Sequence, residues 1–375
     1  MSLDFLSGIR VLDLSQFLPG PFATQMLADM GADVVKVEPP QGDPMRALDP
    51  VTNDRGDGPY HALVNAGKRV IRLDLKSDTG KADFTRLIAA ADVLMESYRP
   101  GVMDKLGFGH ERLRELNPGL VHCALSGYGQ NGPMRLTGGH DINYVAAAGQ
   151  LGLSGAADKP HMAYPMVADF AGAMQSVTAM LGALVGRGRT GLGAYLDVAM
   201  ADSVLAWQSQ SLTALAMGNR PGRDQNLLTG GAAFYGVYET QDGGFVSLGA
   251  IEKIFWKNFC DAVSRPDLVA RQSEPLPQSD LIDEVSQIFK GRSRADWDAC
   301  LGQVDCCYHP VLSIDEVGAH PQNDARGLIR PQPGLESSGA VAVLQAFWTD
   351  GQAPSPRAAM RDVQPAEIIK DWCSD

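Results

Sequence analysis

Three polar residues stand among small and apolar neighbours and carry side chains suited to proton transfer or nucleophilic attack. His140 and Asp169 lie at the starts of two predicted helices, and Glu252 follows a predicted hairpin. An imidazole and a carboxylate can exchange protons with a substrate, and a carboxylate can also act as a nucleophile. Each also has a plainer interpretation: Asp169 as a helix N-cap, His140 as a structural histidine and Glu252 as a first-turn acid. These residues alone leave both interpretations open.

The position of Asp169 leads to an expectation about its charge. The string Met166-Val167-Ala168-Asp169 opens a helix, so the helix dipole and the free amides of the first turn would hold the carboxylate ionised. The same amides are candidate hydrogen-bond donors for an oxyanion that develops on a substrate.

Motifs for several other kinds of site are missing from the sequence. The glycine clusters, such as Gly149-Gln150-Leu151-Gly152, match neither a dinucleotide-binding GxGxxG after a strand nor a Walker A motif. No two histidines have the helical spacing of metal ligands, and Gly-x-Ser-x-Gly is absent. We therefore expect no nucleotide site of these types, no metal site and no α/β-hydrolase nucleophile.

The elements that must position the candidate residues begin with an alternation of strands and helices. Strands are predicted at the apolar runs 9–14, 32–37, 70–74, 93–95, 120–125 and 194–198, and helices at 22–30, 81–90 and from about 200 to 215. Such alternation with nearly all-apolar strands predicts a parallel α/β sheet covered on both faces. A hairpin is predicted at 236–240 and 245–248, after a polar linker at 217–230.

Composition narrows the class of protein. The chain has 375 residues, of which 45% are hydrophobic and 20% charged, and its net charge is −12. This balance excludes a disordered chain or a disulfide scaffold, and an acidic chain is poorly suited to tracking nucleic acid. The six cysteines show no CxxC spacing, the N-terminus does not resemble a signal peptide, and no uninterrupted apolar run spans a bilayer. We expect a soluble, cytoplasmic protein with no nucleic-acid or membrane partner.

Several motifs in order along the chain resemble the family III CoA-transferase (CaiB/BaiF) superfamily, which includes the α-methylacyl-CoA racemases. The resemblance extends to about residue 328. It is carried by Gly8-Ile9-x-Val11-Leu12-Asp13-Leu14, Pro19-Gly20-Pro21, Gly31-Ala32-Asp33-Val34-Val35-Lys36-Val37-Glu38, Lys68-Arg69-x-Ile71-x-Leu73-Asp74-Leu75-Lys76, Tyr98-Arg99-Pro100-Gly101 and Ser126-Gly127-Tyr128-Gly129-Gln130.

Within the superfamily, local features resemble racemases more closely than transferases. These are Gly139-His140-Asp141-Ile142-Asn143-Tyr144, Gly230-Gly231-Ala232-Ala233-Phe234-Tyr235, Gly249-Ala250-Ile251-Glu252 and Asp305-Cys306 with Pro310-Val311-Leu312. Other features, Val37-Glu38-Pro39-Pro40 and an insertion at 41–59, look more like transferases. Lys253-Ile254-Phe255-Trp256 stands where racemases carry PQF, and the tail after Arg330 matches neither group.

The resemblance implies a racemase that inverts the α-carbon of a 2-methylacyl-CoA by 1,1-proton transfer through an enolate. His140 and Asp169 would be the two acid–base groups, and Glu252 would orient His140. The alternative is a transferase that moves CoA between carboxylates, with Asp169 as covalent nucleophile and His140 structural. A third possibility is a CoA-ester-binding protein without activity, which would need none of His140, Asp169 and Glu252.

The resemblance also implies how CoA is held and how the chain is organised. Arg99 and Lys105, with Lys68 or Arg69 as weaker candidates, would bind the phosphates, and Tyr98 would pack on the adenine. No metal or other cofactor is implied. The expected architecture is α/β: a large Rossmann-like domain at 1–205, a linker at 206–228, a smaller α+β domain at 229–317, and a linker and return at 318–375. Two chains would interlock as a homodimer, with the active site between the large domain of one and the small domain of the other.

Overall fold

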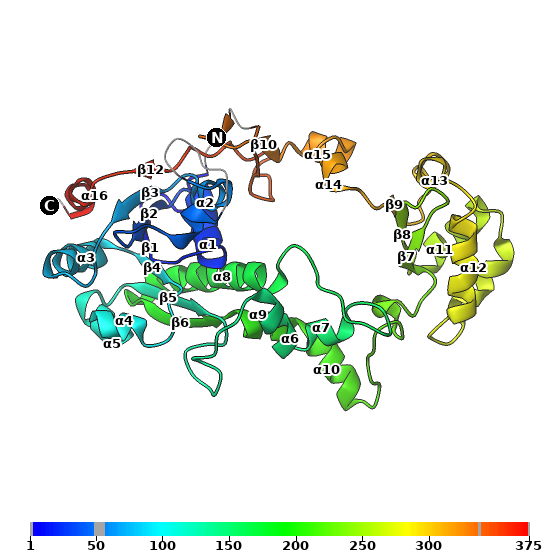
Figure 1. The fold of residues 1–375 in the computed structure, drawn as a ribbon, viewed down its shortest axis with the longest axis horizontal. Coiled ribbons are helices and arrows are strands. Elements are labelled where there is room, and N and C mark those ends of the chain that lie inside the picture. Colours follow the sequence, from blue (N-terminus) through cyan, green and yellow to red (C-terminus); the bar gives the residue numbers. More distant parts are fainter. Residues whose placement is uncertain (1–2, 49–56, 337–338, 374–375) are drawn as a thin grey trace. The chain divides into compact units, whose positions relative to one another are not determined.

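The computed structural model describes residues 3–48, 57–336 and 339–373 (Figure 1). The chain forms two compact units: the first comprises 1–148, 165–207 and 320–375, and the second 149–164 and 208–319. Residues 149–164, which we placed in the large domain, therefore lie in the second unit, as does most of the expected linker 206–228. The two segments are joined by Arg223, which donates to the carbonyls of Gly152 and Ala156 at 2.8 Å each. Part of the insertion at 41–59, residues 49–56, lies outside the described residues.

A seven-stranded sheet forms the centre of the first unit, and its strand order is β12-β3-β2-β1-β4-β5-β6. Every neighbouring pair is parallel. The six strands that the sequence predicts here are confirmed, and two of them, β4 and β5, are buried along their whole length. The strands are β1 (Arg10–Asp13), β2 (Asp33–Glu38), β3 (Arg69–Arg72), β4 (Val93–Glu96), β5 (Val121–Ser126), β6 (Ala194–Ala199) and β12 (Arg361–Asp362).

Helices cover both faces of this sheet. One face is covered by three helices, α3 (Asp78–Ala90), α5 (His110–Leu116) and α16 (Pro365–Cys373). These helices share a hydrophobic core with the strands. The core includes Leu12 and Leu94 from the strands and Phe84 and Trp372 from the helices. On the other face lie α1 (Pro19–Asp29), α8 (Val167–Thr190) and α9 (Met200–Trp207), with α8 packed on β5 and β6. This two-sided cover explains why the strands are apolar runs and not alternating patterns.

Three helix boundaries differ from the predicted ones. The helix expected from residue 22 begins at Pro19, because prolines fit the first turn, where no amide donor is needed. The helix expected from residue 81 begins at Asp78, because the Ser77 hydroxyl accepts from the Gly80 amide at 3.1 Å. The helix expected to continue to 215 is interrupted at Gln208, after which α10 (Ser209–Ala216) begins.

Helix α8 is the longest apolar helix of the first unit. Its 24 residues are long and apolar enough to cross a membrane, by length and composition alone. In the structure it lies on the parallel sheet between α1 and α9, and Phe170 in its first turn packs edge-on against Phe22 of α1 at 5.0 Å. Two large apolar side chains of its outer face, Met174 and Val185, are exposed.

The chain returns to the first unit after residue 319. Strand β10 (Ile329–Pro331) pairs antiparallel with β11 (Val341–Val343), β12 adds to the sheet beside β3, and α16 packs against α3 (Figure 1). Arg357 forms an ion pair with Asp29 of α1 at 2.7 Å, in which both side chains are nearly buried. The returning segment thus completes the edge of the sheet and one of its helical layers.

The second unit contains an antiparallel sheet of β7 (Tyr235–Glu239), β8 (Phe245–Gly249) and β9 (Tyr308–Pro310), in the order β7-β8-β9. The predicted hairpin is confirmed, and β9 is an addition to it. Around the sheet, α11 (Lys253–Ala262), α12 (Ser279–Phe289) and α13 (Arg294–Leu301) enclose an aromatic core of Trp256, Phe259, Phe289 and Trp297.

The remaining elements are short. They are η1 (Pro44–Ala47), α2 (Pro59–Asn65), α4 (Val102–Leu106), α6 (Asp141–Ala147), α7 (Gln150–Leu153), η2 (Leu227–Thr229), η3 (Pro266–Ser273), α14 (Ile314–Val317) and α15 (Pro321–Arg326).

A buried ion pair holds the centre of the first unit. The Lys68 ammonium lies 2.9 Å from Asp13 Oδ2, and both side chains are fully buried. The Lys68 ammonium also donates hydrogen bonds to the Pro21 carbonyl, the Thr24 hydroxyl and the Asn65 side-chain oxygen, at 2.8 to 3.0 Å. Burial alone raises the pKa of Asp13, but Lys68, a second lysine and two hydroxyl groups bring it down to about 2. The pair therefore links the end of β1 to the first turns of α1.

We predict that Lys68→Met lowers the free energy of unfolding by about 3–5 kcal/mol, because it leaves the Asp13 carboxylate buried without its cation. Urea denaturation at neutral pH measures the change. Lys290→Met, which removes an exposed pair with Glu239, is the control and costs less than about 1 kcal/mol. The double variant Asp13→Leu/Lys68→Met recovers part of the loss. An effect of Lys68→Met no larger than that of the control contradicts the account.

Candidate active site

The carboxyl ends of the strands form a pocket at the point where the strand order reverses. In the order β3-β2-β1-β4-β5-β6, the loops after β1 and β4 leave in opposite directions, which opens a crevice between them. A pocket of about 400 Å³ lies there. It is lined by Gln16 after β1, by 37–41 at the end of β2, by 73–76 after β3, and by Tyr98, Val102 and Leu106 after β4.

The turn after β4 carries three of the residues that the resemblance assigns to CoA. Glu96 Oε2 accepts from the Tyr98 amide at 2.7 Å, which fixes the turn into α4. The half-buried Tyr98 ring lines the pocket and packs against the core beneath it. Arg99 is exposed, and Lys105 is exposed one residue before Leu106 of the pocket wall. Lys76, which the sequence analysis did not select, also lines the pocket.

The two weaker phosphate candidates are not available, and these predictions were wrong. Lys68 is fully buried and saturated by Asp13 and its other acceptors, so it cannot reach a solvent-borne phosphate. Arg69 is the first residue of β3, at the amino edge of the sheet, and its guanidinium pairs with Asp33 and Asp371. The Lys-Arg dipeptide is therefore structural.

His140 and Asp169 come together in the first unit from two helix starts. His140 is the N-cap of α6 and exposed, and its amide donates to Asn143 Oδ1 at 3.0 Å. Asp169 lies in the first turn of α8, which packs against α6, and is partly buried. His140 lies close enough to act on the charge of Asp169. The structure thus brings these two predicted residues into one site.

Asp141, next to His140, links the two helix starts and was missed as a separate functional residue. Its Oδ1 accepts from the amides of Ala168 at 2.6 Å and Asp169 at 3.2 Å. Met166, the N-cap position of α8, makes no side-chain cap, so Asp141 supplies the cap from another helix. A local sequence pattern does not show this contact, because the partners are about 27 residues apart.

The first turn of α8 was expected to favour the ionised form of Asp169, but the pKa of this carboxyl group is raised instead of lowered. Burial and the neighbouring Asp141 carboxylate raise the pKa of Asp169 to about 6, and His140 lowers it by less. Two amides of the α8 first turn are already bound to Asp141, so they neither hold Asp169 ionised nor remain available to an oxyanion. A carboxyl group with this pKa is suited to both giving and accepting a proton near neutral pH.

A tyrosine holds the loop that leads to His140. The Tyr144 hydroxyl donates to the Gly139 carbonyl at 2.5 Å, and its ring packs edge-on against Tyr128 at 5.1 Å. A Cβ at Gly139 would lie 2.8 Å from the Tyr144 ring, and a Cβ at Gly127 would overlap it more severely. Glycine is therefore required at both positions for the loop to approach the ring.

Arg99 lies beside the same loop. A Cβ at Gly138 would be 3.2 Å from Arg99 Nη2, and the guanidinium is near enough to lower the pKa of Tyr144 against the dominant effect of burial. Arg99 therefore lies between the pocket wall after β4 and the loop that ends in His140.

Glu252 lies in the second unit, where it is the exposed N-cap residue of α11 with no side-chain cap of its own. Cys307 lies near Glu252 and is largely exposed. The loss of some solvent around its thiol and the charge of Glu252 both raise the pKa of this thiol. The expected pairing of Glu252 with His140 joins residues of different units and stays a prediction.

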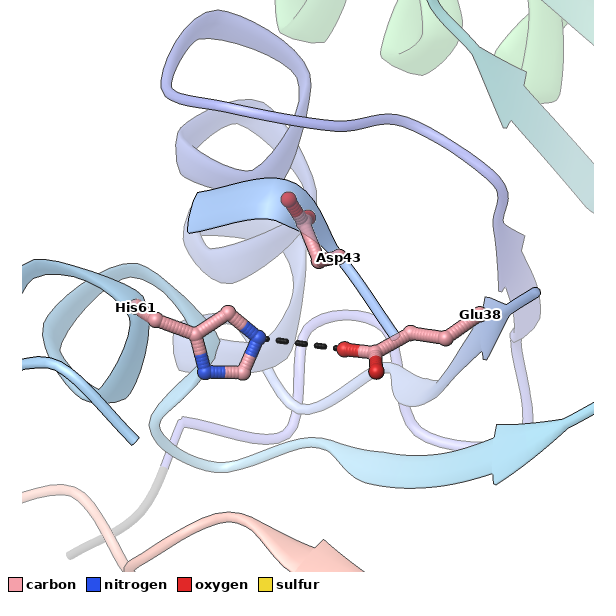
Figure 2. Close-up of side chains that lie close together, drawn as sticks. All are labelled: Glu38, Asp43 and His61. Carbon is pink, nitrogen blue, oxygen red and sulfur yellow. Dashed lines mark hydrogen bonds and ion pairs between the residues drawn. The ribbon is translucent and has the colours of Figure 1, made fainter. Parts of the chain in front are cut away.

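One cluster in the first unit has the residue types of a metal site. Potential ligand atoms of Glu38, Asp43 and His61 lie within 4.8 Å of one another, and all three side chains are buried (Figure 2). However, Arg46 donates to Glu38 at 2.8 Å, and Lys36 lies 3.0 Å from Asp43. The positive charge that a metal ion would supply is therefore already provided by side chains.

This cluster is instead an ion-pair network beneath the pocket. His61 Nε2 lies 3.1 Å from Glu38 Oε1, as the dashed line in Figure 2 marks. Burial opposes ionisation, but the hydrogen bonds from His61 and Arg46 hold the pKa of Glu38 at about 2. Because Glu38 and the following residues line the pocket, the network fixes one wall of it.

Comparison with known proteins agrees with this fold. Residues 6–360 match CoA-transferase family III, and the chain belongs to that family. The α-methylacyl-CoA racemase of Homo sapiens is 36% identical over 86% of this chain and 81% of its own length. The succinyl-CoA:mesaconate CoA-transferase of Haloarcula marismortui is 37% identical over 98% of this chain and 96% of its own. A crystal structure of a CAIB/BAIF family protein from Brucella suis superimposes with a TM-score of 0.83 at 28% identity, covering 98% of this chain and 99% of the other.

We predict that Lys76→Ala and Lys105→Ala each weaken binding of free CoA about tenfold, because each removes a charge-assisted contact to a phosphate at the pocket. Isothermal titration calorimetry measures the dissociation constant. Lys290→Ala, an exposed lysine of the second unit, is the control and leaves it unchanged. Unchanged affinity in both pocket variants would place the phosphates elsewhere.

Proposed function

We propose that this protein is a 2-methylacyl-CoA racemase, which inverts the α-carbon of the thioester by 1,1-proton transfer. The observation that carries the proposal is that His140 and Asp169 lie at two adjoining helix starts, with the pKa of Asp169 raised to about 6. Inversion requires a base on one face of the α-carbon and an acid on the other. A histidine and a protonatable carboxyl group satisfy this requirement in both directions.

In the proposed reaction one of the two groups removes the α-proton, and the electron pair of the broken C–H bond moves toward the thioester oxygen to give an enolate. The other group then donates its proton to the opposite face, and the C–H bond forms with inverted configuration. In this proposal the first-turn amides of Ala168 and Asp169 do not bind the enolate oxygen, because both donate to Asp141.

Substrate binding in this proposal uses the pocket at the carboxyl ends of the strands. Tyr98 packs against the adenine, Lys76 and Lys105 face the phosphates, and Arg99 lies near the loop before His140. Glu252 orients His140, and no cofactor takes part besides the CoA of the substrate. The acyl chain that the enzyme prefers is outside the proposal.

The proposal includes a homodimer in the cytoplasm. Its support is a set of large apolar side chains that are exposed on two packed helices of the first unit: Met174 and Val185 on α8, and Leu205 and Trp207 on α9. Exposed apolar side chains of this size are typical of a surface that a partner covers. Sedimentation equilibrium measures the mass of the protein in solution. A monomer at micromolar concentration would contradict the proposed homodimer.

A CoA-transferase is the second candidate. It is supported by transferase relatives that are as similar to this chain as the racemases are: one transferase is 37% identical over 98% of this chain, and the human racemase is 36% identical over 86% of it. In that reaction Asp169 attacks the thioester carbonyl, expels the CoA thiolate and forms a mixed anhydride. The CoA thiolate then attacks the Asp169 carbonyl of the anhydride, which releases the first acid and leaves an aspartyl-CoA thioester. The second carboxylate attacks this thioester and expels the CoA thiolate, which attacks the acyl carbonyl of the new anhydride to give the second acyl-CoA and free Asp169.

We predict that one enantiomer of a 2-methylacyl-CoA, incubated in D₂O without an acceptor acid, gains deuterium at the α-carbon and loses optical purity. Mass spectrometry and chiral chromatography follow the two changes. His140→Gln and Asp169→Asn each reduce interconversion about 10²–10⁴-fold, while His161→Gln, an exposed histidine of the second unit, is the control. A hydroxylamine-sensitive acyl-enzyme at Asp169, with no exchange, would establish the transferase instead.

A further inference from the structure

The chain offers no short connection between α6 and α8. Residues 149–164, which separate the two helices, belong to the second unit. The direct polar link between the two helix starts is therefore Asp141 Oδ1, which accepts from Ala168 N and Asp169 N at 2.6 and 3.2 Å. Ala168 is completely buried, so its amide would lack a water partner without this carboxylate.

We propose that Asp141 is a positioning residue that acts through Asp169: it fixes the first turn of α8 against α6 and keeps a negative charge beside the Asp169 carboxyl group. In this proposal the Asp141 side chain does not contact the substrate, and it affects the reaction only through Asp169. The proposal rests on the proposed function for its kinetic consequence, but its structural part concerns Asp169 in the free enzyme.

The two effects of Asp141 can be separated by chemistry. As a cap, its oxygen needs only to accept hydrogen bonds, which an asparagine amide oxygen also does. As a charge, it disfavours a second carboxylate nearby, so it raises the pKa of Asp169 together with burial. Asp141→Asn therefore keeps the cap and removes the charge, whereas Asp141→Ala removes both.

The other charged groups around Asp169 act weakly or elsewhere. On α6, His140 opposes the effect of Asp141, and Tyr144 lies beside them with Arg99 on its far side. The remaining elements packed against α8 also carry titratable groups. Asp29 of α1 pairs with Arg357, Asp197 of β6 accepts from the Gln130 amide, and Asp202 of α9 is exposed. Burial lowers the pKa of His122 of β5 to about 4 and raises the pKa values of Cys123 of β5 and Tyr195 of β6 to about 12.

The test begins without substrate. In protein labelled with ¹³C at aspartate carboxyl carbons, the Asp169 resonance is assigned by its loss in Asp169→Asn and titrated by NMR. In Asp141→Asn we expect its midpoint to move by roughly one pH unit toward acid. Asp202→Asn, an exposed carboxylate on α9, is the matched control and leaves the midpoint unchanged. An unchanged midpoint in a folded Asp141→Asn variant overturns the proposal, whatever reaction the enzyme catalyses.

The kinetic arm uses the racemisation assay. In a racemase that uses two acid–base groups, each limb of the kcat/KM profile belongs to the pair and is the same in both directions of the reaction. In Asp141→Asn we expect the acidic limb to move toward acid in both directions of the reaction, with binding of free CoA unchanged. A merely structural residue would lower the whole profile and leave its limb in place, which would also overturn the proposal. Loss of racemisation in the unmodified protein, with the NMR shift retained, would reject the proposed function but not the role of Asp141.

Discussion

One carboxylate oxygen connects the starts of the two helices at which His140 and Asp169 lie. Asp141 Oδ1 accepts from two amides in the first turn of α8 while Asp141 itself begins α6. The parallel sheet places α8 against β5 and β6, and the Tyr144 contact places the glycine loop before His140. Without this cap, each helix would still be held by its own packing, but no hydrogen bond from Asp141 would join the two helix starts. The placement of His140 relative to Asp169 depends on this contact.

Three carboxyl groups of the first unit that are buried or partly buried have pKa values shifted in opposite directions. Asp13 and Glu38 are buried but surrounded by Lys68, Lys36 and Arg46, and their pKa values are held at about 2. They remain charged at any working pH and stabilise the sheet and one pocket wall. The pKa of Asp169 is raised to about 6 because burial and a like charge act on it without a compensating cation as close. The same residue type thus stabilises the fold in one place and has, in another, the pKa that the proposed proton transfer requires.

The fold was more predictable than the site. Strands that are covered by helices on both faces of the sheet, such as β4 and β5, are short apolar runs. Their burial can therefore be predicted from neighbouring residues in the sequence. Lys68 shows the limit of this reasoning, because nothing near it in the sequence indicates that its partner is Asp13, 55 residues earlier. The role of Asp141 was hidden for the same reason. His140 and Asp169 were found through the resemblance to a family, since each alone matches an ordinary helix start.

The central claim is that His140 and Asp169 serve opposite faces of one α-carbon. The measurement that tests it most directly is deuterium exchange of each pure enantiomer by the two single variants. A base that survives alone can remove and return the proton on its own face only. The account predicts that His140→Gln exchanges one enantiomer and Asp169→Asn the other, each with retention of configuration. Exchange of the same enantiomer by both variants, or interconversion by either variant at the rate of the unmodified protein, would contradict the account.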